Sequence, residues 1–164
     1  MDYILFQYLG NKNDNNRDKI EFKDDTFVIT FYKEKNTTKN YSQSKLREQI
    51  KILYNKWIEK QADIIFINKI QRYSHEIGVS PKNYRIKFLK NRWGSLTKKC
   101  VIVLNTNLVK TPEEIIDYII IHELCHLKIQ GHSHHFWRFL KQFEPEYEKK
   151  IKWLELNSNN ILLS

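Results

Sequence analysis

The most continuous hydrophobic pattern in the chain lies between Thr111 and Gly131. Apolar side chains occupy almost every side of this stretch, and only one narrow stripe is polar. Such an apolar surface is typical of a helix buried in a protein core. Thr111 suits the N-cap, Pro112 suits the first helical position, Glu114 completes a capping box, and Gly131 suits a helix end. The pattern therefore predicts a buried helix over residues 111–131.

The N-terminal part of the chain combines short strand patterns with one long helical pattern. Residues 2–32 contain three apolar, partly alternating runs separated by polar turns, which predict a small antiparallel β meander. Residues 42–77 keep helical spacing over a length that is unusual for one globular helix. We therefore expect a long helix there, with a break near residues 61–63.

The C-terminal part is predicted to form a β hairpin before the buried helix and short helices after it. Asn83–Lys90 alternates apolar and polar side chains, and the apolar run Val101–Asn105 follows a turn that contains glycine. Helical patterns return at residues 133–143 and 145–156. The hairpin strands lead directly into the 111–131 helix.

The order of these elements predicts an α+β fold in a single domain. We expect small antiparallel sheets packed on helices, with the 111–131 helix at the centre. Within the domain, residues 1–164, the β meander covers residues 2–32, and the helices plus the β hairpin cover residues 42–156. With 164 residues, the chain is long enough for one hydrophobic core.

Three ionisable side chains, His122, Glu123 and His126, interrupt the apolar helix pattern. Burying them costs several kcal/mol unless a partner compensates them. The i, i+4 spacing places both histidines on one helix face, where they suit two positions of a tetrahedral zinc site. Glu123 lies within reach of a metal-bound water, which is the H-E-x-x-H arrangement. Two core histidines without metal would leave Glu123 buried without a partner, so the sequence favours a metal site.

Composition and cysteine usage indicate a soluble cytoplasmic protein. Hydrophobic residues make up 41% of the chain and aromatic residues 13%, as in globular proteins rather than disordered ones. No apolar run approaches the roughly 18 residues that span a bilayer, and the N-terminus has no basic region typical of a signal peptide. Two cysteines, Cys100 and Cys125, do not form a disulfide framework. We expect no membrane partner.

The net charge of +9 is concentrated in one segment. Between Gly78 and Pro112 there is no acidic residue, and eight residues are basic: Lys82, Arg85, Lys87, Lys90, Arg92, Lys98, Lys99 and Lys110. A field of this sign attracts nucleic acids or acidic substrates. A background composition rich in lysine and asparagine explains the same excess, and the sequence leaves both interpretations open.

Several short motifs together resemble the YgjP-like metallopeptidase family, which is related to the SprT and WLM zinc peptidases. The motifs, in chain order, are YLG at Tyr8–Gly10, RWGS at Arg92–Ser95, a strand ending at Asn105, HELCHL at His122–Leu127 and GHSHHFW at Gly131–Trp137. Their joint occurrence is far more specific than H-E-x-x-H alone. One departure is Leu96, which stands where relatives usually have a cysteine after the RWGS serine.

The resemblance implies a zincin-like domain with a catalytic zinc ion. Its ligands would be His122, His126 and His132, and Glu123 would be the catalytic residue. His134 and His135 are alternatives for the third ligand that the family pattern disfavours. Glu144, Glu146 and Glu148 are further alternatives, but they flank Pro145 at the start of a lysine-rich helix that we expect on the surface. Arg92, His134 and His135 are candidates for stabilising the negatively charged oxygen that develops during peptide hydrolysis.

The sequence therefore predicts a zinc metallopeptidase in which Glu123 activates a zinc-bound water for peptide hydrolysis. We expect an extended peptide substrate to add as a strand to Val101–Asn105, taken as a free sheet edge. One alternative is a zinc-dependent nucleotide pyrophosphatase, although the sequence contains no glycine-rich phosphate loop. Another is a nucleic-acid-associated protease or binding module that uses the basic segment 82–110.

Overall fold

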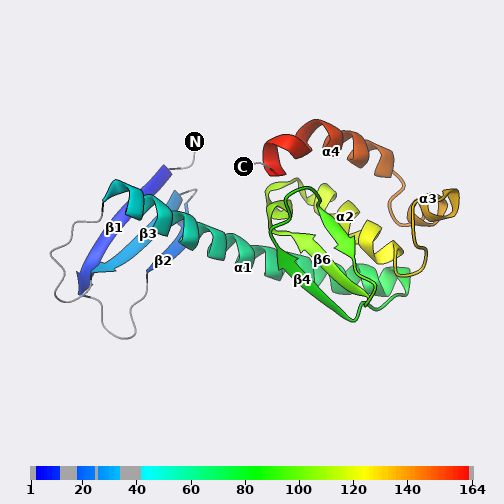
Figure 1. Ribbon diagram of the computed structural model, residues 1–164, viewed down its shortest axis with the longest axis horizontal. Helices are drawn as coiled ribbons and strands as arrows, with labels where there is room; N and C mark the ends of the chain where they lie inside the picture. The colour runs from blue at the N-terminus through cyan, green and yellow to red at the C-terminus, as the bar shows by residue number, and fades with distance from the viewer. Residues whose placement is uncertain (1–2, 12–17, 25, 34–41, 163–164) are drawn as a thin grey trace. The chain divides into compact units, whose positions relative to one another are not determined.

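The computed structural model describes residues 3–11, 18–24, 26–33 and 42–162, which form an α+β fold (Figure 1). The chain divides into two compact units, Met1–Ile58 and Glu59–Ser164. In the described ranges, four α-helices and two three-stranded sheets make up these units, as the predicted fold class requires. The assignment of residues 1–164 to a single domain stays a prediction.

The first unit contains a mixed sheet rather than the predicted antiparallel meander. Its strands are β1 (Tyr3–Asn11), β2 (Lys19–Lys23) and β3 (Thr26–Lys33), in the order β1-β3-β2. β2 pairs with β3 antiparallel, and Asp24, with φ of 48°, lies in the tight turn between them. β1 pairs with the other edge of β3 and runs parallel to it. The meander prediction was wrong because β1 does not pair with its neighbour in sequence.

Helix α1 (Gln43–Ile77) is continuous, so the predicted break near residues 61–63 is wrong. Its residues up to Ile58 belong to the first unit, where Phe27 of β3 packs edge-on against Trp57 at a ring distance of 5.2 Å. Buried side chains recur every three or four residues across the expected break: Ile58, Ala62, Phe66, Ile70, Tyr73 and Ile77. Ala62 continues this apolar stripe, which removes any need for the helix to end there.

The sheet of the second unit also differs from the prediction. It consists of β4 (Asn83–Lys87), β5 (Gly94–Leu96) and β6 (Val101–Asn105), in the order β4-β6-β5. β4 and β6, the two predicted hairpin partners, run parallel, while β5 and β6 form the antiparallel pair. The predicted hairpin and the predicted antiparallel sheets are therefore wrong, because the stretch taken as a turn contains a third strand.

The position of β6 has a direct consequence for substrate binding. β6 lies between β4 and β5, so its backbone donors and acceptors on both sides are already paired. The prediction that Val101–Asn105 offers a free edge to a peptide is wrong for this reason. The edge strands of this sheet are β4 and β5.

Helix α2 (Glu113–Cys125) is buried as predicted but shorter at both ends. Thr111 does not cap it, because the Thr111 hydroxyl donates to the Leu108 carbonyl at 2.8 Å and closes the preceding 3₁₀ helix, η1 (Thr106–Lys110). The N-cap is Pro112, without a side-chain hydrogen bond. The helix ends at Cys125, and turns carry the chain to Gly131, whose φ of 74° is accessible to glycine.

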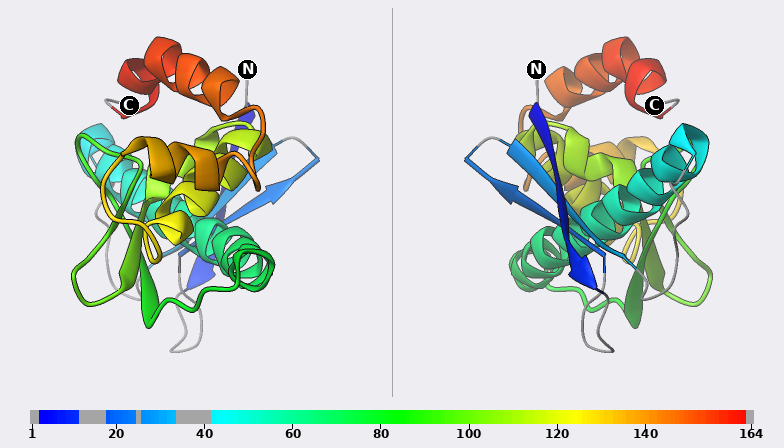
Figure 2. Two further views of the ribbon diagram at one scale, coloured as in Figure 1. Left: turned by 90° about the vertical axis from the view of Figure 1, so that its right-hand side faces the viewer. Right: turned by 90° about the vertical axis from the view of Figure 1, so that its left-hand side faces the viewer.

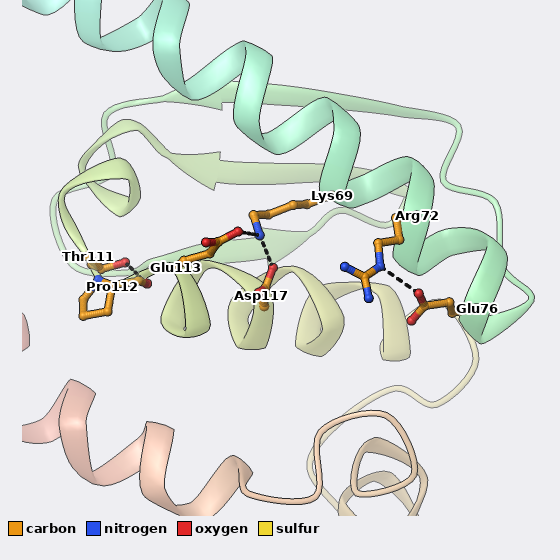
Figure 3. Close-up of polar contacts among 7 residues, drawn as sticks. All are labelled: Lys69, Arg72, Glu76, Thr111, Pro112, Glu113 and Asp117. Atoms are coloured by element: carbon orange, nitrogen blue, oxygen red, sulfur yellow. Dashed lines mark hydrogen bonds and ion pairs between the residues drawn. The ribbon is translucent and has the colours of Figure 1, made fainter.

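Ion pairs connect α2 to the second half of α1 (Figure 3). The Lys69 Nζ atom lies 2.6 Å from Asp117 Oδ1 and 2.7 Å from Glu113 Oε1. The side chain of Lys69 is 14% exposed to solvent, and that of Asp117 is 21% exposed. Arg72 and Glu76, both on α1, form a more exposed pair at 2.9 Å.

Two further helices, α3 (His134–Leu140) and α4 (Tyr147–Leu162), complete the second unit. α4 packs against α2 and η1 (Figure 1 and Figure 2). Its C-terminal part is tied to the core, since the Trp93 indole donates to Ser158 Oγ at 2.9 Å and Asn107 Nδ2 donates to the Ile161 carbonyl at 3.1 Å. None of the helices in the described ranges is long and apolar enough to cross a membrane.

Candidate metal centre

Three histidine side chains meet at the C-terminal end of α2. The Nε2 atom of His122 lies 3.1 Å from that of His126 and 3.0 Å from that of His132, and the last two atoms are 3.3 Å apart. His122 is on α2, His126 is its C-cap residue, and His132 follows the chain reversal at Gly131. Among the described residues, these three form the cluster able to hold a metal ion.

Neighbouring groups orient each histidine. The Nδ1 atom of His126 lies 3.1 Å from the Ile129 carbonyl, which fixes the tautomer with Nε2 unprotonated. The Tyr118 hydroxyl lies 3.5 Å from His122 Nδ1. The Trp137 indole donates to the His132 backbone carbonyl at 3.1 Å, and Phe136 stacks on His126 at a ring distance of 4.3 Å. These contacts hold the rings with their Nε2 atoms facing one another.

Burial favours the neutral imidazoles of His122 and His126. Desolvation, followed by the charges of His126 and His132, lowers the pKa of His122 to about 3. Desolvation also lowers the pKa of His126. The three Nε2 atoms lie 3.0–3.3 Å apart, and a divalent cation among them could accept a lone pair from each. The donor set therefore fits a metal ion.

Glu123 is buried beside the histidines, with 7% of its surface exposed. Desolvation raises the pKa of its carboxyl group to about 7, against the opposing effects of a hydrogen bond from the Leu96 backbone and the charge of Arg92. Gly94 lies so close that a Cβ atom there would stand 2.8 Å from Glu123 Oε1. The strand β5 thus supports the carboxylate directly.

An open cavity of about 480 Å³ gives access to this group of side chains. β5 and the residues after it form one wall, and the chain around Gly131 forms another. The lining residues are Gly94, Ser95, Leu96, Thr97, Lys98, His122, Glu123, His126, Gln130, Gly131 and His132. The arrangement brings three nitrogens able to hold a metal ion, a buried carboxylate and a strand edge to one place.

The other residues singled out from the sequence lie elsewhere. His134 and His135 begin α3, and neither belongs to the histidine cluster or lines the cavity. Arg92 does not line the cavity, but its charge acts on Glu123. Glu144, Glu146 and Glu148 are not part of the cluster either, within the described ranges.

Several residues of the site were not recognised as such from the sequence. Lys98 and Gln130 line the cavity, Tyr118 contacts His122, and Trp137 holds the His132 backbone. The sequence contained two signals: Lys98 belongs to the basic segment, and Trp137 lies five residues after His132 in the GHSHHFW motif. Large aromatic rings usually serve core packing, so the motif alone did not reveal this contact.

The chain is similar to one protein family and to several known proteins. The YgjP-like metallopeptidase domain matches residues 10–157. The metallopeptidase zymogen of Pyrococcus abyssi abylysin is 26% identical, with a TM-score of 0.50 over 55% of this chain and 92% of that chain. The corresponding zymogen of Methanocaldococcus jannaschii jannalysin is 28% identical, with a TM-score of 0.47 over 54% and 94%.

A UTP pyrophosphatase of Escherichia coli (strain K12) is 28% identical over 86 residues, which is 52% of this chain and 48% of that protein. The chain thus matches about half the length of this relative. The family match is far more extensive, since it includes the sheet β4-β6-β5, the three histidines and Glu123. Its extent shows that the protein belongs to the YgjP-like metallopeptidase family.

Proposed function

We propose that the protein is a zinc-dependent metallopeptidase that hydrolyses peptide bonds. The observation that carries this proposal is the convergence of three histidine Nε2 atoms, 3.0–3.3 Å apart, beside a buried glutamate in an open cavity. Family membership and the likeness to the abylysin zymogen support it.

Zinc is the ion that this donor set favours. Histidine nitrogens about 2.0–2.1 Å from zinc at tetrahedral angles lie roughly 3.3–3.4 Å from one another, which is close to the observed spacing. His122, His126 and His132 would hold the ion and leave its fourth position open. When bound, zinc lowers the pKa of water toward about 7 and polarises the scissile carbonyl.

Glu123 would be the general base and then the general acid. Its carboxylate accepts a proton from the attacking water and delivers that proton to the leaving amine. The side chain lines the cavity next to the histidines without belonging to their cluster, which suits this role. Burial raises the pKa of Glu123, which makes the carboxylate a stronger base.

The substrate would bind as an extended strand along β5. β5 is an edge strand, and the segment from Gly94 to Lys98 lines the cavity. A peptide that adds to this edge uses backbone hydrogen bonds, and it brings a carbonyl group next to the histidines. This edge replaces Val101–Asn105 as the proposed substrate strand.

Nucleotide hydrolysis is the second candidate activity. Lys98 in the cavity wall offers a cation to a phosphate group, and the E. coli relative is a UTP pyrophosphatase. The chain lacks a glycine-rich phosphate loop, which favours the peptidase.

A nucleic acid is a further proposed partner, through the basic segment 82–110. Arg85, Lys87, Lys90 and Arg92 are exposed, and none forms an ion pair with an acidic residue that the structure describes. Phe88, 60% exposed, lies between two of these cations and offers a stacking surface for a base.

A substrate comparison tests the proposal. Purified protein with zinc is incubated with a fluorogenic peptide library and, in parallel, with UTP. We expect peptide cleavage that a chelator abolishes and added zinc restores. Pyrophosphate release from UTP without peptide cleavage would favour nucleotide hydrolysis over the proposed peptidase activity. No turnover of either substrate would contradict both proposed activities.

A further inference from the structure

The amide of Asn105 organises the chain that leads into β5. Asn105 is fully buried, and its Nδ2 donates to the Leu89 carbonyl at 2.7 Å and to the Arg92 carbonyl at 2.8 Å. Its Oδ1 accepts from the Asn107 backbone at 3.0 Å. The Asn105 backbone N–H donates to the Trp93 carbonyl at 2.8 Å. One side chain thus satisfies three backbone groups and holds the segment between β4 and β5 in place.

The segment that Asn105 holds leads into β5, and the backbone of β5 contacts Glu123. Gly94 follows Trp93 directly, and a Cβ atom at Gly94 would lie 2.8 Å from Glu123 Oε1 and 2.9 Å from its Cγ. Real Cβ atoms essentially never approach a heavy atom so closely. Two residues later, the Leu96 backbone hydrogen-bonds to the same carboxylate. β5 therefore supports Glu123 at two points.

We infer that Asn105 and Gly94 are positioning residues for Glu123. Asn105 fixes the start of β5, and the missing side chain of Gly94 lets the strand backbone rest on the carboxylate. Neither residue is needed to hold a metal, and each acts through Glu123. The inference rests on the proposed role of Glu123 as general base, but the contacts themselves do not depend on that role.

The sharpest variant is Gly94→Ala, because the added methyl group displaces the Glu123 carboxylate. Misplacing a catalytic group by about 1 Å costs up to about 10²-fold in rate. We expect kcat to fall about 10- to 100-fold with KM within about twofold, and metal content to stay unchanged. The control is Gly78→Ala, where φ of 67° strains the backbone, but the nearest atom beyond the adjoining residues, Lys128 Nζ, lies 3.8 Å from the added Cβ. It should lose stability and keep kcat.

The second variant is Asn105→Asp, which keeps the shape but removes both hydrogen-bond donors to Leu89 and Arg92. Its control is Asn107→Asp, which removes a comparable donor to the Ile161 carbonyl on α4. Both changes should lower the melting temperature, while kcat should fall in Asn105→Asp alone. Equal kcat per folded molecule in Asn105→Asp and in Asn107→Asp would overturn the role of Asn105. If Asn105→Asp does not fold, Asn105→Ser is measured against Asn107→Ser with the same criterion.

A structural readout separates this inference from the proposed function. In crystals of the Gly94→Ala protein, the Glu123 carboxylate should move away from β5, whether or not the wild type cleaves peptides. In Asn105→Asp, hydrogen exchange at the Leu96 amide should become faster, and in Asn107→Asp it should not. An unmoved carboxylate with unchanged Leu96 exchange would overturn the inference, whereas absence of peptide cleavage in the wild type would contradict only the proposed function.

Discussion

At the scale of single residues, burial acts oppositely on two neighbours in α2. Desolvation lowers the pKa of His122 to about 3 and raises the pKa of Glu123 to about 7. Both changes favour the uncharged side chain. For His122, the uncharged form is the one that binds a metal ion. For Glu123, the raised pKa makes the carboxylate a stronger base next to the proposed metal ligands.

Replacing Glu123 by glutamine tests the general base. Glu123→Gln keeps the size of the side chain but cannot accept a proton. We expect the protein to fold and to keep its metal content, and peptide hydrolysis to fall at least about 10²-fold. Metal analysis and steady-state kinetics on the same preparation measure both. Wild-type rates in the variant would refute the assignment of the base.

Histidine variants test the third ligand. Because the Nε2 atom of His132 lies 3.0 and 3.3 Å from those of the other two histidines, His132→Ala should release the metal and lower the melting temperature. His134→Ala and His135→Ala are matched controls, since both residues lie outside the cluster. They should copurify with stoichiometric zinc. Retained zinc in His132→Ala, with loss in a control, would contradict the ligand assignment.

At the scale of elements, the site depends on how α2 is held between its neighbours. β5 and β6 pack on one side of α2, and Lys69 of α1 binds Asp117 and Glu113. The Lys69 pair with Asp117 is largely shielded from water, whereas the Arg72–Glu76 pair on the same helix is exposed. The two pairs therefore differ in what they contribute to stability.

Removing the charge of Lys69 should destabilise the second unit. Lys69→Met preserves the aliphatic stem but leaves Asp117 without its cation. We expect the free energy of unfolding to fall by about 1–2 kcal/mol, the range for charged hydrogen bonds that are partly screened. Arg72→Met is the control and should change stability little. Denaturant unfolding of both variants measures the free energy of unfolding. Equal losses of stability would refute the idea that the Lys69 ion pairs stabilise the packing of α2 on α1.

At the scale of the whole molecule, the chain carries a large positive net charge. The net charge is +9, and residues 79–111 contain eight basic and no acidic side chains. Such a distribution raises the rate at which polyanions associate. Whether it also binds them depends on contacts with phosphate groups, which salt weakens.

Salt dependence tests nucleic-acid binding. Affinity for single-stranded DNA should fall steeply with salt, with a log–log slope of about −0.7 for each phosphate contact. Charge reversal of Arg85, Lys87 and Lys90 should weaken binding further. Reversal of Lys51, Lys56 and Lys60, which are exposed on α1, changes the net charge equally and should have a smaller effect. If the affinity does not change with salt, or if the two charge reversals weaken binding equally, the basic segment is not a nucleic-acid site. Its charge would then reflect only the lysine-rich composition of the chain.

The sequence alone determined the features that depend on local pattern. The buried helix carrying His122 and Glu123, with His126 as its C-cap, follows from apolar residues on almost all sides. The order of the motifs identified the family that the comparison confirms. These features need only short-range information, because helical spacing and side-chain chemistry are both local.

Tertiary structure decided which strands pair and which backbone meets Glu123. β5 reads as a turn because Gly94 and Ser95 are typical of turns, and it becomes a strand only because β6 pairs with it. The same pairing places β6 in the middle of its sheet and β5 at the edge beside the cavity. Thr111 likewise bonds to η1 instead of capping α2. Strand order and capping partners depend on residues distant in sequence, whose competition for the same hydrogen bonds is resolved only when the chain packs.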